Sequence, residues 1–213
     1  MNRILITQRL ARDKYGDYID YLENGYINFF SHFNITPILL PNNIKDPIEY
    51  FLDLRCNKII LTGGDDIKEI SKNNRTNKEF KRDHNEKKLI KYSIRNKIPV
   101  FCICRGFQLM NVVLGGQITE NISTGIEENQ KVIITDPSEN VGTIIVNSYH
   151  NHGVKLEQLS KHLIAKGLSI NGDYVEYFMH KSLPIIGIQW HPERKIKSRK
   201  FNKSLFNTFL EMK

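Results

Sequence analysis

The first half of the chain alternates short apolar runs with longer stretches of helical periodicity, the pattern of βαβ units around a parallel sheet. The expected strands cover residues 4–7, 36–40, 58–62 and 99–103. Apolar positions from Tyr18 to Phe33 recur at three- and four-residue steps and predict one helix. Asp46-Pro47 is a good helix start, with Asp as cap and Pro in the first turn. Further helices are expected over 77–96 and 105–114, the latter ending at Gly115-Gly116.

The second half consists mainly of short β-like runs with turns between them. These runs cover 132–135, 142–147, 162–166, 174–179 and 184–190, and they predict a partly antiparallel extension of the sheet. A closing helix is expected over 198–212, where apolar residues fall in phase. Since no internal repeat or linker interrupts the pattern, we expect one α/β domain spanning residues 1–213.

The composition is that of an ordinary globular protein, with 213 residues, 40% hydrophobic and 25% charged. Three cysteines are too few for a disulfide scaffold and favour a reducing compartment. No apolar run approaches the roughly 18 residues that a membrane helix needs, and the apolar stretch at the N-terminus is too short for a secretory signal. We therefore expect a cytoplasmic enzyme without membrane contact.

The chain carries a net charge of +8, and its basic residues cluster at 72–97 and 194–203. Such runs are usually solvated helix faces, which is the favoured interpretation. The alternative is that they steer an anionic substrate or bind a partner. No nucleic-acid-binding motif accompanies them, so nucleic acid is not an expected partner.

The segment Cys102-Ile-Cys104-Arg-Gly106 lies where a buried strand turns sharply into a helix, the setting of a nucleophile elbow. Such a turn favours small residues two positions before and after the nucleophile. Cys104 has Cys102 and Gly106 there, whereas Cys102 would have the bulkier Val100. The following helix N-terminus would stabilise a thiolate. Two alternatives are a pair of core cysteines and a metal-binding pair, for which Cys56 is the only further thiolate.

A nucleophilic cysteine needs a base, and the base often needs an orienting acid. His191-Pro-Glu193 follows a late strand and supplies both, although a surface His-Pro turn is the commoner meaning of such a pattern. His191 would accept the thiol proton and return it to the leaving group, while Glu193 would hold the imidazole. Gly63-Gly64 ends another strand at the same edge, and an N–H there would form an oxyanion hole with that of Arg105.

With these motifs in this order, the sequence resembles the class I glutamine amidotransferase family. More narrowly, it is similar to the γ-glutamyl hydrolase branch, the peptidase C26-like group. The resemblance extends over nearly the whole chain and is carried by the segments 61–67, 82–86, 104–111, 146–150 and 189–193. It implies a flavodoxin-like α/β fold, in which helices flank a mostly parallel sheet with an antiparallel extension.

The resemblance also assigns roles to individual residues. It implies a triad of Cys104, His191 and Glu193. The oxyanion and substrate-binding residues that it implies are Gly63, Gly64, Arg105, Gln108, Ser148, Tyr149 and His150, with the N–H groups of Gly64 and Arg105 in the oxyanion hole. Cys104 would attack a γ-glutamyl carbonyl, form a glutamyl thioester and release an amine, and water would then free glutamate. The family needs no metal or organic cofactor.

Some positions depart from the family pattern. Cys102 stands where the family usually has Gly, and Asn151-His152 stands where the branch tends to have His-Gln. The chain is also short between residues 120 and 142. These departures affect the leaving group rather than the reaction type. A short, basic chain of this kind resembles hydrolases of γ-glutamyl-CDP-amidate in bacterial capsule phosphoramidate synthesis, which implies an anionic, nucleotide-linked substrate. Small γ-glutamyl amines are the conservative alternative.

Three functional hypotheses remain at this point. The first is a stand-alone γ-glutamyl hydrolase, and the second is a glutaminase subunit that delivers ammonia to a separate synthase chain. The third, a degenerate binding module, is disfavoured by the intact triad. Two weaker signals are a metal pair at His150 and His152, and a cation or substrate amino-group site at Asp65-Asp66.

Overall fold

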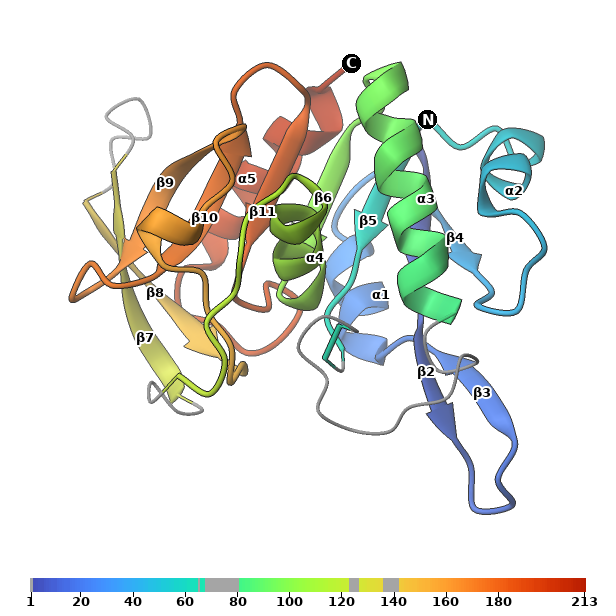
Figure 1. Ribbon diagram of the computed structural model, residues 1–213, viewed down its shortest axis with the longest axis horizontal. Coiled ribbons are helices and arrows are strands. Elements are labelled where there is room, and N and C mark those ends of the chain that lie inside the picture. Colours follow the sequence, from blue (N-terminus) through green and yellow to red (C-terminus); the bar gives the residue numbers. More distant parts are fainter. Residues whose placement is uncertain (1, 65, 68–80, 123–126, 136–141) are drawn as a thin grey trace.

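The computed structural model describes residues 2–64, 66–67, 81–122, 127–135 and 142–213. Its largest element is a nine-stranded sheet with the order β4-β1-β5-β6-β11-β10-β9-β7-β8 (Figure 1). A separate two-stranded hairpin contains β2 and β3. The strands are β1 (Asn2–Thr7), β2 (Arg9–Arg12), β3 (Tyr18–Tyr21), β4 (Ile35–Leu40), β5 (Lys58–Leu61), β6 (Val100–Ile103), β7 (Glu127–Ile134), β8 (Thr143–Ser148), β9 (Leu163–Ser169), β10 (Val175–His180) and β11 (Ile185–Ile188).

The sheet has a parallel half and an antiparallel half. β4, β1, β5, β6 and β11 pair in parallel, whereas β10, β9, β7 and β8 continue the sheet through antiparallel pairs. If the five parallel strands are numbered by their order along the chain, their order in the sheet, β4-β1-β5-β6-β11, is 2-1-3-4-5. In sheets of this order, ligands bind beyond the carboxyl ends of the strands. This confirms the fold class expected from the sequence, including the antiparallel extension.

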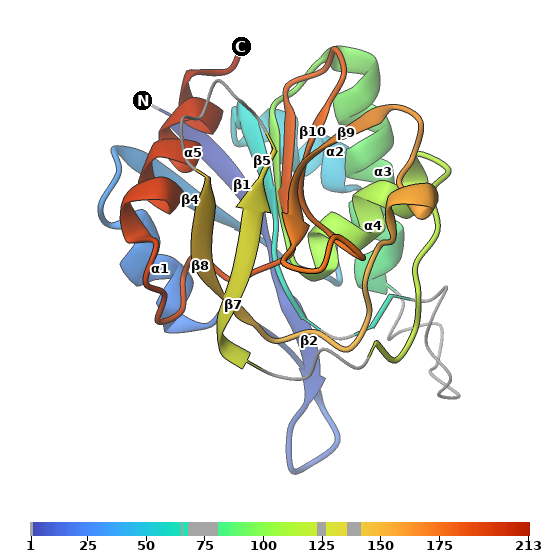
Figure 2. The same cartoon turned by 90° about the vertical axis from the view of Figure 1, so that its left-hand side faces the viewer.

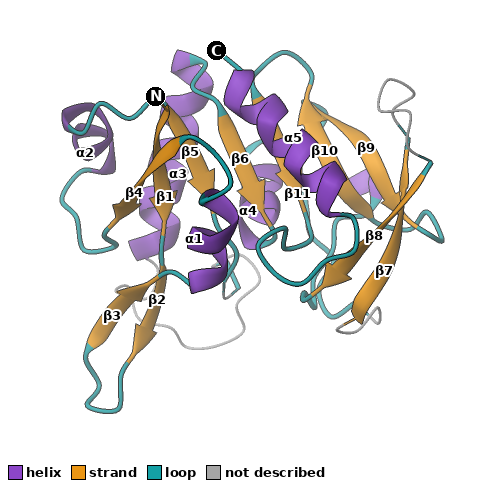
Figure 3. Ribbon diagram, turned by 180° about the vertical axis from the view of Figure 1, so that it is seen from behind, coloured by secondary structure: helices purple, strands orange, loops and turns teal. Residues whose placement is uncertain are grey.

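The helices form two layers. α1 (Asn24–Phe30) and α5 (Arg199–Glu211) cover one face (Figure 3), while α2 (Pro47–Asp53), α3 (Lys81–Asn96) and α4 (Arg105–Val113) cover the other. Figure 2 shows the sheet between these layers. Each layer has its own apolar cluster, and all four residues of β5 and of β6 are buried. Strands covered on both faces need continuous apolar runs, which is why these two were evident from the sequence.

Local sequence signals fix two of the helix ends. The Asp46 side chain accepts a hydrogen bond from the Ile48 backbone N–H, 2.9 Å, with Pro47 in the first turn of α2. After the C-terminal end of α4 the chain turns at Gly115, whose φ of 89° is readily adopted only by a residue without a side chain. Both features agree with the expected boundaries.

The single helix expected between Tyr18 and Phe33 is wrong in its first part. Tyr18–Tyr21 forms β3 and pairs with β2, and the helix itself covers only Asn24–Phe30. The ring of Tyr18 lies under the guanidinium of Arg12, 4.7 Å from its centroid, instead of facing the core. Tyr18 has the spacing of a helix face but belongs to a hairpin, and periodicity alone does not distinguish these two cases.

Several expectations fall on parts of the chain that the structure does not cover. α3 starts at Lys81, and residues 77–80 of the expected helix lie outside the described residues, as do Asp65 and the basic stretch 72–80. β7 starts at Glu127, earlier than the apolar run indicated. Within the described ranges, no helix combines the length and the apolar character needed to cross a membrane.

Candidate active site

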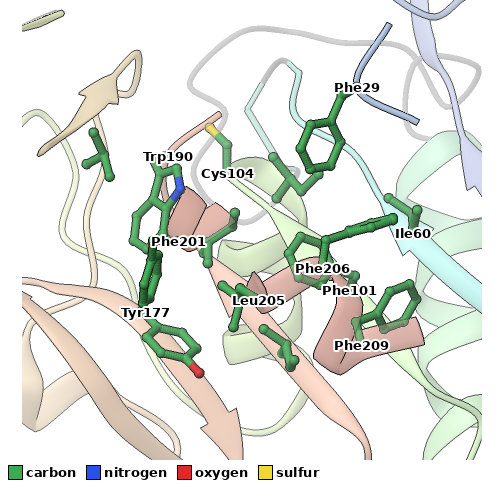
Figure 4. Close-up of a cluster of buried hydrophobic side chains, with 14 of the residues drawn as sticks. Phe29, Ile60, Phe101, Cys104, Tyr177, Trp190, Phe201, Leu205, Phe206 and Phe209 are labelled. Atoms are coloured by element: carbon green, nitrogen blue, oxygen red, sulfur yellow. The ribbon is translucent and has the colours of Figure 1, made fainter. Parts of the chain in front are cut away.

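Cys104 forms a strained elbow between β6 and α4. Its φ and ψ are 50° and −101°, values that a residue with a side chain rarely adopts. The Cys104 N–H donates to the Ile188 carbonyl, 2.8 Å, and its carbonyl accepts from Gln108 N, 3.1 Å. A Cβ on Gly106 would lie 2.5 Å from the Leu61 carbonyl oxygen, so this close turn requires Gly there. Figure 4 shows the Cys104 sulfur at the edge of the aromatic cluster.

Cys102 points to the other side of the sheet. It belongs to the apolar cluster under α2, α3 and α4, whereas Cys104 belongs to the one under α1 and α5. Complete burial, together with the nearby Glu86 carboxylate, raises the pKa of Cys102 well above its usual value. Cys102 is therefore a protonated core thiol, and of these two cysteines only Cys104 borders the cavity described below.

His191 and Glu193 follow β11, and His191 interacts with both Cys104 and Glu193. His191 Nδ1 lies 2.6 Å from Glu193 Oε1, and both side chains are buried. Asn147, at the end of β8, holds the His191 backbone twice: its Oδ1 accepts from His191 N and its Nδ2 donates to the His191 carbonyl, each at 2.9 Å. The imidazole is thus fixed both by its carboxylate and by its own main chain.

The charge on His191 is set by its two neighbours. Burial would lower its pKa, but the negative charges of Cys104 and Glu193, and hydrogen bonds to both, outweigh burial and raise the pKa to about 10. At neutral pH the His191 ring is therefore a positively charged imidazolium beside Cys104, where it would stabilise a thiolate. The thiolate is the nucleophilic form, and the imidazolium is a ready proton donor.

The two glycines after β5 have different surroundings. The Gly63 N–H donates to the Tyr26 hydroxyl, 2.9 Å, and a Cβ on Gly63 would lie 2.6 Å from His191 Cε1. Gly63 therefore lets the imidazole of His191 approach the strand end, while the Gly63 N–H is already bonded to Tyr26. Gly64 lies with Arg105 on the lining of the cavity at Cys104, the arrangement that an oxyanion hole requires.

A cavity of about 200 Å³ opens at Cys104. It is lined by Gly64, Asp66, Cys104, Arg105, Gln108, Tyr149, His150, Asn151 and His152. Gln108 Nε2 donates to the His152 carbonyl, 3.1 Å, and Tyr149 stands edge-on to the His191 ring. Of the residues expected at the oxyanion hole or the substrate, Gly63 and Ser148 are not on this lining, and Ser148 is buried at the end of β8.

Residues 6–193, which are most of the chain, match the peptidase C26 family. The chain belongs to the peptidase C26 family. Among its relatives, protein NtpR of Enterococcus hirae is 28% identical over 221 residues, covering 92% of this chain and 91% of that protein. The γ-glutamyl-CDP-amidate hydrolase of Campylobacter jejuni is 31% identical over 194 residues, covering 89% of each chain.

Solved structures agree with this assignment at the level of the fold. A glutamine amidotransferase from Thermotoga maritima superposes with a TM-score of 0.65 at 18% identity, covering 99% of this chain and 84% of that one. The family and its hydrolase relative together indicate a hydrolase of the glutamine amidotransferase-like type.

This C26 member also carries buried polar groups beside the cavity. His150 Nδ1 lies 2.9 Å from the His152 carbonyl, and His150 Nε2 lies 3.9 Å from Glu176 Oε2. Burial lowers the pKa of His150 to about 4 and raises that of Glu176 to about 8, so both side chains are neutral at pH 7. The approach of these two atoms is therefore not an ion pair, and neither atom makes a hydrogen bond within the described part of the chain.

The weaker signals in the sequence have simple local partners. His152 Nε2 lies 3.1 Å from Asp66 Oδ1, and the His150 ring faces Glu176. In the part of the chain that the structure covers, no group of three or more His, Cys, Asp or Glu residues is placed to hold a metal ion. Asp65 lies outside the described residues.

Sequence reasoning assigned no role to three residues that shape the site of this C26 member. Tyr26, which holds the Gly63 N–H, was interpreted as one member of an apolar helix face. Asn147 lies inside the family-like segment 146–150, which was the available signal for it. Glu176 lies in a strand with no nearby motif, so nothing in the sequence singled it out.

Proposed function

We propose that the protein is a cysteine hydrolase that cleaves the amide or amidate bond of a γ-glutamyl conjugate and releases glutamate. The observation that carries this proposal is the Cys104–His191–Glu193 arrangement at a strained elbow, with the His191 pKa raised to about 10 by Cys104 and Glu193 despite burial. Membership of the peptidase C26 family supports the same chemistry.

The first half of the proposed reaction transfers the glutamyl group to the enzyme. The Cys104 thiolate attacks the γ-carbonyl carbon, and the resulting oxyanion faces the N–H groups of Gly64 and Arg105. As the carbon–nitrogen bond breaks, His191 gives its proton to the departing nitrogen. A glutamyl thioester remains on Cys104.

The second half releases glutamate. The now neutral His191 takes a proton from water, whose oxygen attacks the thioester carbon. The carbon–sulfur bond breaks, glutamate departs, and the Cys104 thiolate and the His191 imidazolium are restored. Glu193 keeps the ring oriented throughout and stabilises its charged form.

We further propose an anionic, nucleotide-linked leaving group of the kind named for the Campylobacter relative. A second cavity, of about 290 Å³, lies beside Glu193 and includes Arg194, Arg199 and Lys203 in its lining. The Arg194 guanidinium stacks 4.5 Å above the ring of Tyr149, which lines the cavity at Cys104. A phosphate-bearing group leaving past Tyr149 would meet Arg194, and we propose that it extends into the second cavity with Arg199 and Lys203.

Glutamate release by the purified protein alone tests both proposals. The panel contains glutamine, γ-glutamyl-γ-aminobutyrate, other γ-glutamyl amines and γ-glutamyl-CDP-amidate. We expect rapid release from γ-glutamyl-CDP-amidate and poor release from glutamine. The double variant Arg199→Gln/Lys203→Gln should lower kcat/KM for the CDP-amidate at least about tenfold more than for an uncharged γ-glutamyl amide.

Other outcomes of the panel are equally informative. Preference for a small γ-glutamyl amine would keep the hydrolase and overturn the anionic leaving group. Silence on every conjugate, with weak glutaminase activity, would favour a glutaminase subunit that requires a synthase partner chain.

A further inference from the structure

Four charged side chains lie buried between α3 and the nucleophile elbow. Arg82, Asp83, Glu86 and Arg105 are each at most 5% exposed. Arg105 pairs through one guanidinium nitrogen with Asp83 and through another with Glu86, while Arg82 Nε donates to Glu86 Oε1, 2.8 Å. Glu86 therefore joins the two guanidinium groups, and the cluster balances two positive and two negative charges.

Glu86 stays ionised inside this cluster. Burial would raise the pKa of its carboxyl, but the charges of Arg105 and Arg82, with hydrogen bonds, leave the pKa below its usual value. A buried cluster of this kind is held only while every partner is present, because removing one leaves an uncompensated charge.

The far end of Arg82 reaches the strand end that carries the two glycines. Its Nη2 donates to the Thr62 carbonyl, 3.0 Å, to the Thr62 hydroxyl, 2.9 Å, and to the Gly63 carbonyl, 2.9 Å. The Gly63 carbonyl and the Gly64 N–H belong to one trans peptide group, so they point in opposite directions. By holding this carbonyl, Arg82 fixes the direction of the Gly64 N–H.

Neighbouring contacts leave that peptide little freedom. The preceding peptide is held on both sides, because its carbonyl accepts from Arg82 and its Gly63 N–H donates to the Tyr26 hydroxyl. Gly64 has a φ of 149°, and a Cβ there would overlap Arg82 Nη1. The guanidinium is thus packed directly against Gly64, which lines the cavity at Cys104.

Arg105 carries the second N–H of the oxyanion hole on its backbone, and its side chain ends in the same cluster. The two donors come from different strand ends, after β5 and after β6. Glu86 is the side chain that contacts the anchors of both.

We infer that Arg82 and Glu86 are positioning residues for the two oxyanion-hole N–H groups. Arg82 orients the Gly63–Gly64 peptide, and Glu86 holds both Arg82 and the Arg105 side chain. Neither Arg82 nor Glu86 is on the lining of the cavity at Cys104. The inference rests on the proposed function for its biological meaning. Its physical content is that acyl transfer to Cys104, which builds an oxyanion, depends on the cluster. Alkylation of Cys104, a displacement at carbon without an oxyanion, does not.

Two reactions of Cys104 separate these effects. The first is the acylation burst with p-nitrophenyl acetate, measured against Cys104→Ala, and the second is the rate of iodoacetamide alkylation followed by mass spectrometry. Arg82→Lys keeps the charge but loses the fork that reaches Glu86 and the two carbonyls together. We expect the acylation rate to fall about ten- to a hundredfold, part of the effect of losing one donor, while alkylation stays within about twofold of wild type.

Glu86→Gln and Lys58→Met are the companion variants. Glu86→Gln keeps the shape of the bridge and should also lower acylation without lowering alkylation. It takes the place of Arg82→Lys in the test if that variant does not fold. Lys58 is another buried cation, at the opposite end of β5, bonded to the Met212 carbonyl. Lys58→Met should lower the melting temperature without changing the ratio of acylation to alkylation.

Three results would overturn the inference: no acylation burst above Cys104→Ala in the wild type, unchanged acylation in both cluster variants, or acylation and alkylation falling together. A wild type that acylates normally but releases no glutamate from any γ-glutamyl conjugate would overturn only the proposed substrate class.

Discussion

His191 holds its proton at neutral pH because two negative groups, Cys104 and Glu193, face its ring. Their attraction exceeds the cost of burial and brings the His191 pKa to about 10. A pKa raised on folding gives stability that is complete below the ordinary pKa of histidine and is lost as the pH rises through about 10. In the proposed reaction the same proton passes to the leaving group, so the charge of this single residue would connect stability to catalysis.

Replacing Glu193 by Gln should shift the pH profile of the enzyme. The amide keeps a hydrogen bond to His191 but removes one of the two negative charges, so the His191 pKa falls. The basic limb of kcat/KM should therefore move to lower pH, and turnover should fall less than in His191→Ala. Glutamate release measured from pH 5 to 10 checks this. An unmoved basic limb, or full activity in His191→Ala, would contradict the assignment.

Glu176 makes a second residue-scale prediction, on stability. Its pKa of about 8 lies above the unfolded value, so the stability from burying the neutral acid is lost as the pH rises through about 8. Glu176→Gln keeps the acceptor for Gln130 and removes this titration. Relative to wild type, its free energy of unfolding should rise with pH by up to about 1.4 kcal/mol per unit.

Urea denaturation at pH 5 and pH 8 measures this effect. The free energy of unfolding of Glu176→Gln minus that of wild type should be more positive at pH 8 than at pH 5. An equal difference at both pH values would show that Glu176 is not buried as a neutral acid.

At the scale of elements, the sequence predicted strands and helices where burial and local caps agree. β5 and β6 are buried on both faces and read as apolar runs, and α2 begins at its capping residue. The β2–β3 hairpin was missed because Tyr18 has the spacing of a helix face but stacks on Arg12 across the hairpin. Cross-strand partners of this kind are set by pairing, which periodicity does not encode.

The cap of α2 can be tested by itself. Asp46→Ala removes the acceptor for the Ile48 N–H and should lower the free energy of unfolding by about 1 kcal/mol. Asp53, an exposed residue at the other end of the same helix, is the matched control. Asp53→Ala should change stability by less than about 0.5 kcal/mol. Equal losses in the two variants, measured by urea denaturation, would remove the capping role.

At the scale of the whole molecule, the nine-stranded sheet brings distant segments to one edge, with β5, β6 and β11 from its parallel half and β8 from its antiparallel half. The residues after β5, β6, β8 and β11 meet there, which is why motifs far apart in the sequence form one site. The meeting of Cys104, His191 and Glu193 could be predicted because each of their motifs follows a recognisable strand. The roles of Tyr26, Glu176 and the bridge from Arg82 to Arg105 could not be predicted, since each depends on packing between elements that only the folded chain shows.

The central claim is that Cys104 carries the glutamyl group during turnover. Mixing the purified protein with γ-glutamyl-CDP-amidate, quenching in acid and analysing the peptides by mass spectrometry tests it most directly. We predict a mass increase of one glutamyl group on the peptide containing Cys104, in the wild type and in Cys102→Ala, and none in Cys104→Ala. An adduct that persists in Cys104→Ala, or turnover without Cys104, would contradict the account.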